Sequence, residues 1–116
     1  MSLSNIEQGT LVVADVLFAE QVGAKRRLAL VISNTNFNKT SEDLIILKVT
    51  SNPGTTIYDI PLTNANTVNK AIKKESAIMV DFPMTISKQN IYAAPDKINQ
   101  LKLNEVKEKM IELYKL

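Results

Sequence analysis

The chain has 116 residues, which is enough for one domain but not for two cores of ordinary size. It contains no cysteine and no histidine, which excludes disulfides, thiolate nucleophiles, a Ser-His-Asp triad and histidine-based metal sites. Its hydrophobic content of 45% is that of a globular protein, and a net charge of +2 does not by itself indicate nucleic-acid binding. The placement of the charges must therefore carry the argument about function.

We treat residues 1–8 as an N-terminal segment, in part an expression remnant, and residues 9–116 as a single domain. No apolar stretch approaches the roughly 20 residues that a membrane-spanning helix needs. The N-terminus also lacks the basic and apolar regions of a secretory signal. We expect a cytoplasmic protein that does not associate with a membrane.

Short strands are predicted through the first half of the chain. Thr10–Phe18 is rich in Val and Leu and follows Gly9, which marks its start. Leu28–Ser33 is a second strand, and Leu44–Thr50 (LIILKVT) is a third. Because both faces of LIILKVT are largely apolar, this strand is expected to lie at the centre of the sheet. The polar stretch 34–43 between the second and third strands is predicted to be a loop.

The second half begins with a turn at residues 52–54 (NPG). Thr56–Leu62 is predicted to be a strand, followed by a polar connection over 64–74 with one short helical turn. Ser76–Phe82 is a further strand, ended by the proline that follows it, and residues 90–94 (NIYAA) supply one more.

The C-terminal segment changes from strand to helix periodicity. Leu103, Val106, Met110 and Leu113 recur at helical spacing, while charged residues of alternating sign take the other side. Such a charged face is typical of a solvated helix surface. A series of short strands followed by one packing helix predicts a mainly β domain, either a small, strongly bent barrel or a sandwich.

Three consecutive positive charges, Lys25, Arg26 and Arg27, precede the apolar run Leu28–Ile32. They could cap an exposed strand end, or they could bind phosphate, which a guanidinium pairs through two parallel hydrogen bonds. The pattern alone favours the strand-end interpretation. Likewise, Thr50 at the end of LIILKVT is explained by a hydrogen bond to nearby backbone.

The order of motifs nevertheless resembles one family. QGTLVVADV and AKRRLALVIS are followed by ILKVTSN, YDIPL, AIKKES and DFPMTIS, and then by an amphipathic helix. This order is similar to that of the MazF/PemK toxin ribonucleases, over essentially the whole chain from residue 9 to 116. Each motif is short, but the six occur in the family's order and spacing.

The resemblance implies an SH3-like, strongly twisted β-barrel with a C-terminal helix, a fold shared with the gyrase poison CcdB. It also implies a homodimer whose interface forms a groove for single-stranded RNA. A cognate antitoxin would place an acidic, disordered tail in that groove. The implied activity is sequence-specific cleavage of RNA without a metal ion or a cofactor, in a toxin–antitoxin system.

The resemblance also assigns roles to individual residues. Arg27 matches an arginine at the rim of the groove, where it would stabilise charge on the phosphate. Thr50 matches a residue whose hydroxyl positions the phosphate, and Asp81 matches a carboxylate with a general acid or base role in some members. The remaining residues expected to contact RNA are Lys25, Arg26, Ser51 and the loop aromatic Phe37.

The chain departs from the family pattern at three positions. Leu28 replaces the proline after the arginine, and Thr10 replaces an acidic residue after the glycine. Met79 stands where some relatives carry a catalytic arginine, so the arginine–aspartate pair with Asp81 is incomplete. Two alternatives therefore stay open: a degenerate relative that binds nucleic acid or an antitoxin peptide without cleavage, and a protein-binding poison similar to CcdB.

Overall fold

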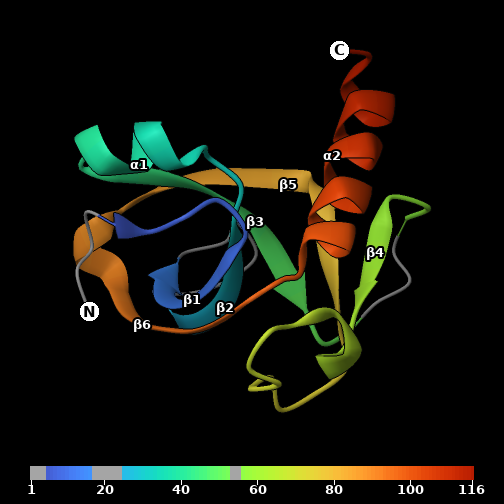
Figure 1. The fold of residues 1–116 in the computed structure, drawn as a ribbon, viewed down its shortest axis with the longest axis horizontal. Helices are drawn as coiled ribbons and strands as arrows, with labels where there is room; N and C mark the ends of the chain where they lie inside the picture. The colour runs from blue at the N-terminus through green and yellow to red at the C-terminus, as the bar shows by residue number, and fades with distance from the viewer. Residues whose placement is uncertain (1–4, 17–24, 53–55) are drawn as a thin grey trace.

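We describe the protein from a computed structural model, in which residues 5–16, 25–52 and 56–116 are defined. Six strands and two α-helices lie within these ranges, together with two short 3-10 helices (Figure 1). In chain order the elements are β1 (Thr10–Val16), β2 (Lys25–Val31), α1 (Thr35–Thr40), β3 (Asp43–Thr50), β4 (Asp59–Leu62), η2 (Asn64–Asn66), β5 (Ser76–Ser87), η3 (Lys88–Asn90), β6 (Ile91–Lys97) and α2 (Gln100–Tyr114).

The strands form a single antiparallel sheet in the order β4-β5-β3-β2-β1-β6. Strand β3 is central, as its two apolar faces predicted. The sheet is strongly bent (Figure 1), but β4 and β6 remain at its two edges, so its hydrogen bonds do not close a barrel. The prediction of a mainly β, strongly twisted fold with a C-terminal helix is confirmed, with the sheet open between β4 and β6 in the described residues.

The two faces of the sheet bury two separate clusters, because alternate residues of a strand point to opposite faces. Leu11, Leu30 and Leu47 belong to the cluster that α2 covers, together with Leu103 and Val106 of the helix. We call this side the helix face. The other cluster, on what we call the N-terminal face, is built around Val12, Ala14, Ala29, Val31, Leu44, Ile46, Ile86 and Ile6.

Helix α2 confirms the predicted helical period. Its N-cap is Asn99, whose side chain accepts a hydrogen bond of 2.8 Å from the backbone N–H of Lys102. Gly9 has φ +94° and lies against the Leu103 side chain, so the chain enters β1 through a conformation that favours glycine. Within the described ranges, no helix is both long enough and apolar enough to cross a membrane.

The expected loop over 34–43 contains α1, so that prediction is wrong for residues 35–40. The helix lacks an apolar stripe and is held by polar contacts instead. The Asn34 side chain caps it by accepting a hydrogen bond of 2.7 Å from the Phe37 N–H. The fully buried amide of Asn38 donates to the carbonyls of Ile6 and Ser33.

Strand β5 continues through Pro83, which was expected to end it. Strand β4 pairs with β5 only over residues 76–79, so the later part of β5 is hydrogen-bonded on one side only. A strand with one free edge tolerates the missing N–H of proline. The expected strand over 56–62 begins only at Asp59, whereas the helical turn in 64–74 and the last strand are confirmed. The predicted turn at 53–54 and the end of the first strand at 17–18 lie outside the described residues.

Candidate functional site

The start of β2 and the end of β3 lie at the same end of the sheet. The two strands pair from Ala29 opposite Lys48 to Val31 opposite Ile46. Arg27 and Thr50 each stand two residues beyond the first of these pairs. Since the side-chain direction alternates along a strand, both residues lie on the N-terminal face, in line with Ala29 and Lys48. The fold therefore places the two residues on which the predicted site most depends at one end and on one face of the sheet.

Arg27 is half-buried and has an unsatisfied donor. Its Nε is fully shielded from solvent, and it donates a hydrogen bond to no atom of the described residues. A buried donor left without an acceptor costs about 1–3 kcal/mol. A ligand oxygen would remove that cost if the side chain shifts to expose the Nε.

The turn that follows β3 contacts the Thr50 hydroxyl. Its Oγ1 accepts a hydrogen bond of 3.0 Å from the backbone N–H of Asn52, which leaves the hydroxyl proton available for donation to a ligand. Ser51, the next predicted site residue, is exposed. Both hydroxyls thus stand at the open end of the strand, where a phosphate could approach them.

Lys48 adds a charge to this face that sequence reasoning missed. Its ammonium lies 4.8 Å from the centroid of the Phe82 ring, in a cation–π contact. The signal was available, because Lys48 is the one charged residue in the apolar strand LIILKVT. A charged side chain is unusual in the central strand of a sheet. Lys48 lies two residues before Thr50, on the same face.

The three consecutive charges at the start of β2 do not form one row. Lys25 and Arg27 are two positions apart and share a face, whereas Arg26 points to the opposite, helix face. There its guanidinium stacks on Tyr92 of β6, 3.4 Å from the ring centroid. Tyr92, which is half-exposed, is a second residue that the sequence did not single out.

Asp81 lies on β5 beyond the part of the strand that pairs regularly with the end of β3. Thr50 pairs with Ala77, and Asp81 stands four residues further along β5, past the pair Lys48–Met79. It occupies the bulge between the pairs Lys48–Met79 and Leu47–Pro83 and is exposed. Among the described residues it makes no ion pair, and no three acidic side chains gather as a metal-binding cluster would.

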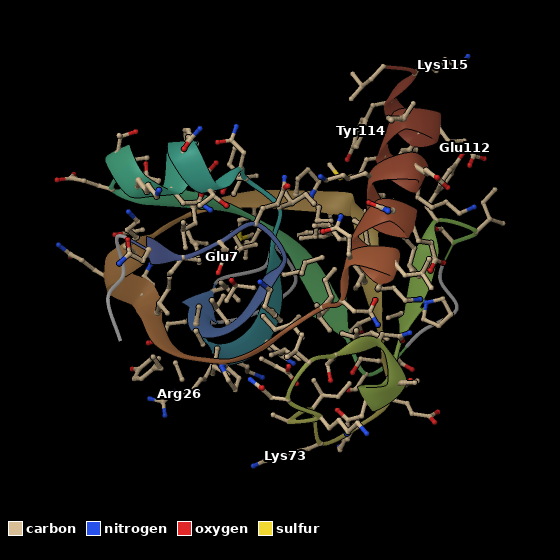
Figure 2. All side chains as sticks on the ribbon, viewed as in Figure 1. Glu7, Arg26, Lys73, Glu112, Tyr114 and Lys115 are labelled. Atoms are coloured by element: carbon tan, nitrogen blue, oxygen red, sulfur yellow. The ribbon has the colours of Figure 1, made fainter. Side chains whose placement is uncertain are left out.

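The residue that Asp81 does influence is Tyr114, at the end of α2 (Figure 2). Burial raises the pKa of the Tyr114 phenol, and the negative charge of Asp81 raises this pKa further. The hydroxyl donates a hydrogen bond of 2.7 Å to the Val80 carbonyl. The phenol therefore stays protonated and ties the C-terminal helix to the bulge.

Phe37 and Met79 also lie away from the pair. Phe37 is on α1, which connects the end of β2 to the start of β3, at the opposite end of these strands from Arg27 and Thr50. Met79 is only 9% exposed and lies between Lys48 of β3 and Asp59 of β4. The side chain of an arginine introduced at position 79 would therefore start from a buried position between β3 and β4.

The comparisons with known proteins identify the family and the fold. Residues 7–114 match the sequence profile of the family described as PemK-like, MazF-like toxin of type II toxin-antitoxin system. A search of curated protein sequences gives no match.

Several solved structures share the fold. The Mycobacterium tuberculosis toxin MazF-mt6 superposes with a TM-score of 0.76 at 12% identity, covering 92% of this chain and 97% of its own. MazF from Deinococcus radiodurans gives 0.74 at 20% identity, covering 96% and 97%. An endoribonuclease in complex with its cognate antitoxin, from a mycobacterial species, gives 0.74 at 13% identity, covering 97% and 95%. At these identities the likeness is one of fold.

Proposed function

Because this chain belongs to the PemK-like, MazF-like toxin family of type II toxin–antitoxin systems, we propose that it is a sequence-specific endoribonuclease that cleaves single-stranded RNA without a metal ion. The observation that carries the proposal is the buried Arg27 Nε without an acceptor among the described residues, at the same end and on the same face of the sheet as Thr50. That arrangement offers a planar cation and a hydroxyl to one phosphate.

In the proposed reaction the 2′-hydroxyl of one nucleotide attacks the adjacent phosphorus. A bond forms between the 2′-oxygen and phosphorus, and the bond between phosphorus and the 5′-oxygen breaks. The products are a 2′,3′-cyclic phosphate and a free 5′-hydroxyl. The guanidinium of Arg27 stays charged at any relevant pH and stabilises the negative charge that builds up on the non-bridging oxygens.

Thr50 positions the phosphate through its hydroxyl proton, with Ser51 beside it. A threonine hydroxyl is too weak an acid to act as a base at neutral pH, so a separate group must exchange protons with the 2′- and 5′-oxygens. Asp81 remains the carboxylate proposed for that exchange. Its place in the β5 bulge makes its contribution the smallest of the three.

The direct test is cleavage of a broad pool of RNA sequences in the presence of EDTA. We expect cuts at one short sequence, with a cyclic phosphate on the upstream fragment. A matched RNA carrying a 2′-deoxy nucleotide at the cleavage position should stay intact, because it lacks the attacking group. Cleavage of that RNA, or activity that EDTA abolishes, would contradict the proposed reaction.

We propose that the active protein is a homodimer with a composite groove for RNA. Light scattering at micromolar concentration should give twice the chain mass. A monomer under these conditions would remove the groove and contradict this part of the proposal.

The proposed protein partner is an antitoxin whose acidic, disordered tail reaches Arg27. Such a tail mimics RNA phosphates and orders as it binds. It should therefore bind more weakly as the salt concentration rises and compete with single-stranded RNA. An antitoxin tail that leaves RNA affinity unchanged at saturation would contradict a shared site.

A second candidate function is binding of RNA or of the antitoxin without cleavage. The buried Met79 favours it, since no arginine stands there to complement Asp81. In that case wild-type protein would bind the RNA pool with a strong dependence on salt but would cut none of its sequences.

A further inference from the structure

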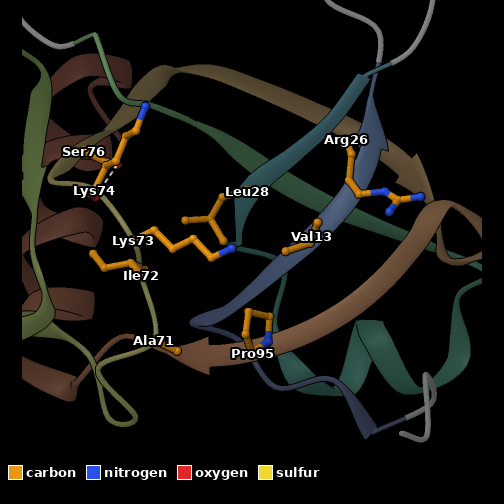
Figure 3. Close-up of a pocket in the computed structure, with 9 residues that line it drawn as sticks. All are labelled: Val13, Arg26, Leu28, Ala71, Ile72, Lys73, Lys74, Ser76 and Pro95. Atoms are coloured by element: carbon orange, nitrogen blue, oxygen red, sulfur yellow. Dashed lines mark hydrogen bonds between the residues drawn. The ribbon is translucent and has the colours of Figure 1, made fainter.

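The helix face carries a cavity of about 530 Å³ that the proposed cleavage reaction does not use. Its floor is aliphatic, formed by Val13 of β1, Leu28 of β2, Ile72 and Pro95 (Figure 3). The volume is in the range of sites that bind small ligands or single anchoring side chains. Leu28 lies on the opposite side of β2 from Arg27, so the cavity and the Arg27–Thr50 pair are on different faces.

Three cationic residues line this cavity. Lys73 extends across it towards Leu28, whereas the Arg26 guanidinium and the Lys74 ammonium lie at its rim and point away from the apolar floor (Figure 3). Both lysines are exposed. Among the described residues none of the three cations has an ion-pair partner, and no acidic residue lines the cavity. As far as the described residues show, the cavity thus combines an apolar surface with positive charge that no carboxylate pairs.

The wall that carries the lysines is held in place by buried polar contacts. The carboxylate of Asp96, only 3% exposed, accepts hydrogen bonds from the backbone N–H groups of Asn69 at 2.7 Å and Ala71 at 2.8 Å. The Asn64 side chain binds both the N–H and the carbonyl of Ile72. The segment is therefore fixed before any ligand arrives, which reduces the entropy lost on binding.

Burial alone would raise the pKa of Asp96, but hydrogen bonds from the Ala71, Asn69 and Lys97 amides and from Thr67 lower it below its usual value. The carboxylate is therefore charged at neutral pH and remains a strong acceptor for this segment.

We propose that this cavity binds an acidic peptide segment that inserts one aliphatic side chain between Leu28 and Pro95. Its carboxylates would lie against Arg26, Lys73 and Lys74. An RNA nucleotide fits less well, because the lining offers no aromatic ring on which a base could stack. Tyr92, which does not line the cavity, already carries the Arg26 guanidinium on its ring.

The inference rests on the proposed function in one respect, namely that the segment belongs to the antitoxin. In that assignment the cavity anchors the antitoxin on the helix face, separately from the tail that reaches Arg27. A short anchor segment would then occupy the protein while RNA is still bound. The tail that follows it would gain a high local concentration near Arg27 and displace the RNA.

The test is a titration of the full-length protein, without RNA, with a short capped peptide that has one leucine flanked by aspartate and glutamate. We expect saturable binding that weakens with salt. Replacing the leucine by serine should reduce affinity by about tenfold, since the apolar contact is lost while the charge is kept. The doubly charge-reversed variant Lys73→Glu/Lys74→Glu should also lose about tenfold or more.

The matched control is Lys39→Glu/Lys107→Glu, which makes the same change in net charge at two exposed lysines away from the cavity. Equal losses in the two variants would show general charge attraction and overturn the inference. Equal affinities of the serine and leucine peptides would also overturn it. The same holds if Lys73→Glu/Lys74→Glu weakens binding of the 2′-deoxy-substituted RNA but not binding of the peptide. Wild-type protein that cleaves RNA but does not bind the peptide would overturn this inference alone. Binding without any cleavage would overturn only the proposed activity.

Discussion

Arg26 and Arg27 are neighbours in the chain, but β2 directs them to opposite faces of the sheet, and the two faces differ in chemistry. Arg27 is half-buried with an unsatisfied Nε among the described residues, pairs with Ala14, and shares its face and its end of the sheet with Lys48 and Thr50. Arg26 is exposed, stacks on Tyr92 and borders an aliphatic cavity. The difference shows that a run of charges in a strand forms two surfaces, one suited to a phosphate and the other to an acidic, partly apolar ligand.

The largest expected effect separates the two arginines. Arg27→Ala should reduce the single-turnover rate of RNA cleavage by about 10²–10³-fold, because it removes a preorganised donor at the phosphate. Arg26→Ala should reduce the same rate by about fivefold or less, the effect of one exposed charge. Both variants should keep the circular dichroism spectrum of the wild type. Equal losses would mean that the two arginines serve one surface after all.

Much of this comparison could be predicted from the sequence, and part of it was missed. The period of two in AKRRLALV places adjacent residues on opposite faces, so the separation of Arg26 from Arg27 follows from the strand prediction alone. The surroundings of Arg26 cannot be predicted in this way, because its partner Tyr92 lies 66 positions further along the chain, on β6. Likewise, the sequence does not bring Lys73 and Pro95 to one cavity, since that depends on how the segment after η2 folds over β1.

The fold, too, could be predicted from the sequence only in part. Apolar periodicity was sufficient for α2 and for the central place of β3. It failed for α1, whose polar sequence is held by capping at Asn34 and by one buried amide, Asn38. Periodicity also does not show whether the two edge strands pair with each other. The sequence therefore could not show that the sheet stays open between β4 and β6 in the described residues.

A second prediction concerns the wall of the cavity. Asp96→Asn should lower the free energy of unfolding by about 1–3 kcal/mol, because an amide NH₂ would replace the oxygen that accepts from Ala71. Urea unfolding at fixed protein concentration measures this difference, and Asp43→Asn at an exposed site is the matched control. If the two variants unfold alike, Asp96 does not hold the segment.

The same variant makes a prediction about pH. The pKa of Asp96 is lower in the folded protein than its usual value of 3.8. Its stabilising effect is therefore fully present above pH 3.8 and is lost as the pH falls through the folded-state pKa. The difference in unfolding free energy between wild type and Asp96→Asn should shrink on acidification below pH 3.8. A constant difference down to low pH would show that ionisation of Asp96 contributes nothing.

A third and smaller effect concerns the hydroxyl on the Arg27 face. Thr50→Ala should reduce the rate of cleavage by about tenfold, which corresponds to one lost hydrogen bond to a charged group. Thr50→Ser keeps the hydroxyl and should retain most of the rate. If serine is as poor as alanine, the methyl group of Thr50 matters rather than its hydroxyl.

The smallest effect is expected at Asp81. Because its place in the β5 bulge limits its contribution, Asp81→Asn should reduce the rate by only about threefold, but it should change the dependence of the rate on pH, since the carboxylate exchanges protons in the proposed reaction. An unchanged rate with an unchanged pH profile would show that another group exchanges these protons.

Simultaneous binding tests the division of β2 into two functional faces most directly. A fluorescent form of the short leucine-containing acidic peptide is titrated into protein saturated with RNA that carries a 2′-deoxy nucleotide at the cleavage position. With separate faces, the peptide should bind with the same affinity, within about twofold, in the presence and absence of the RNA. Displacement of the RNA by this short peptide would show that Arg26 and Arg27 serve a single shared surface, and would contradict the account.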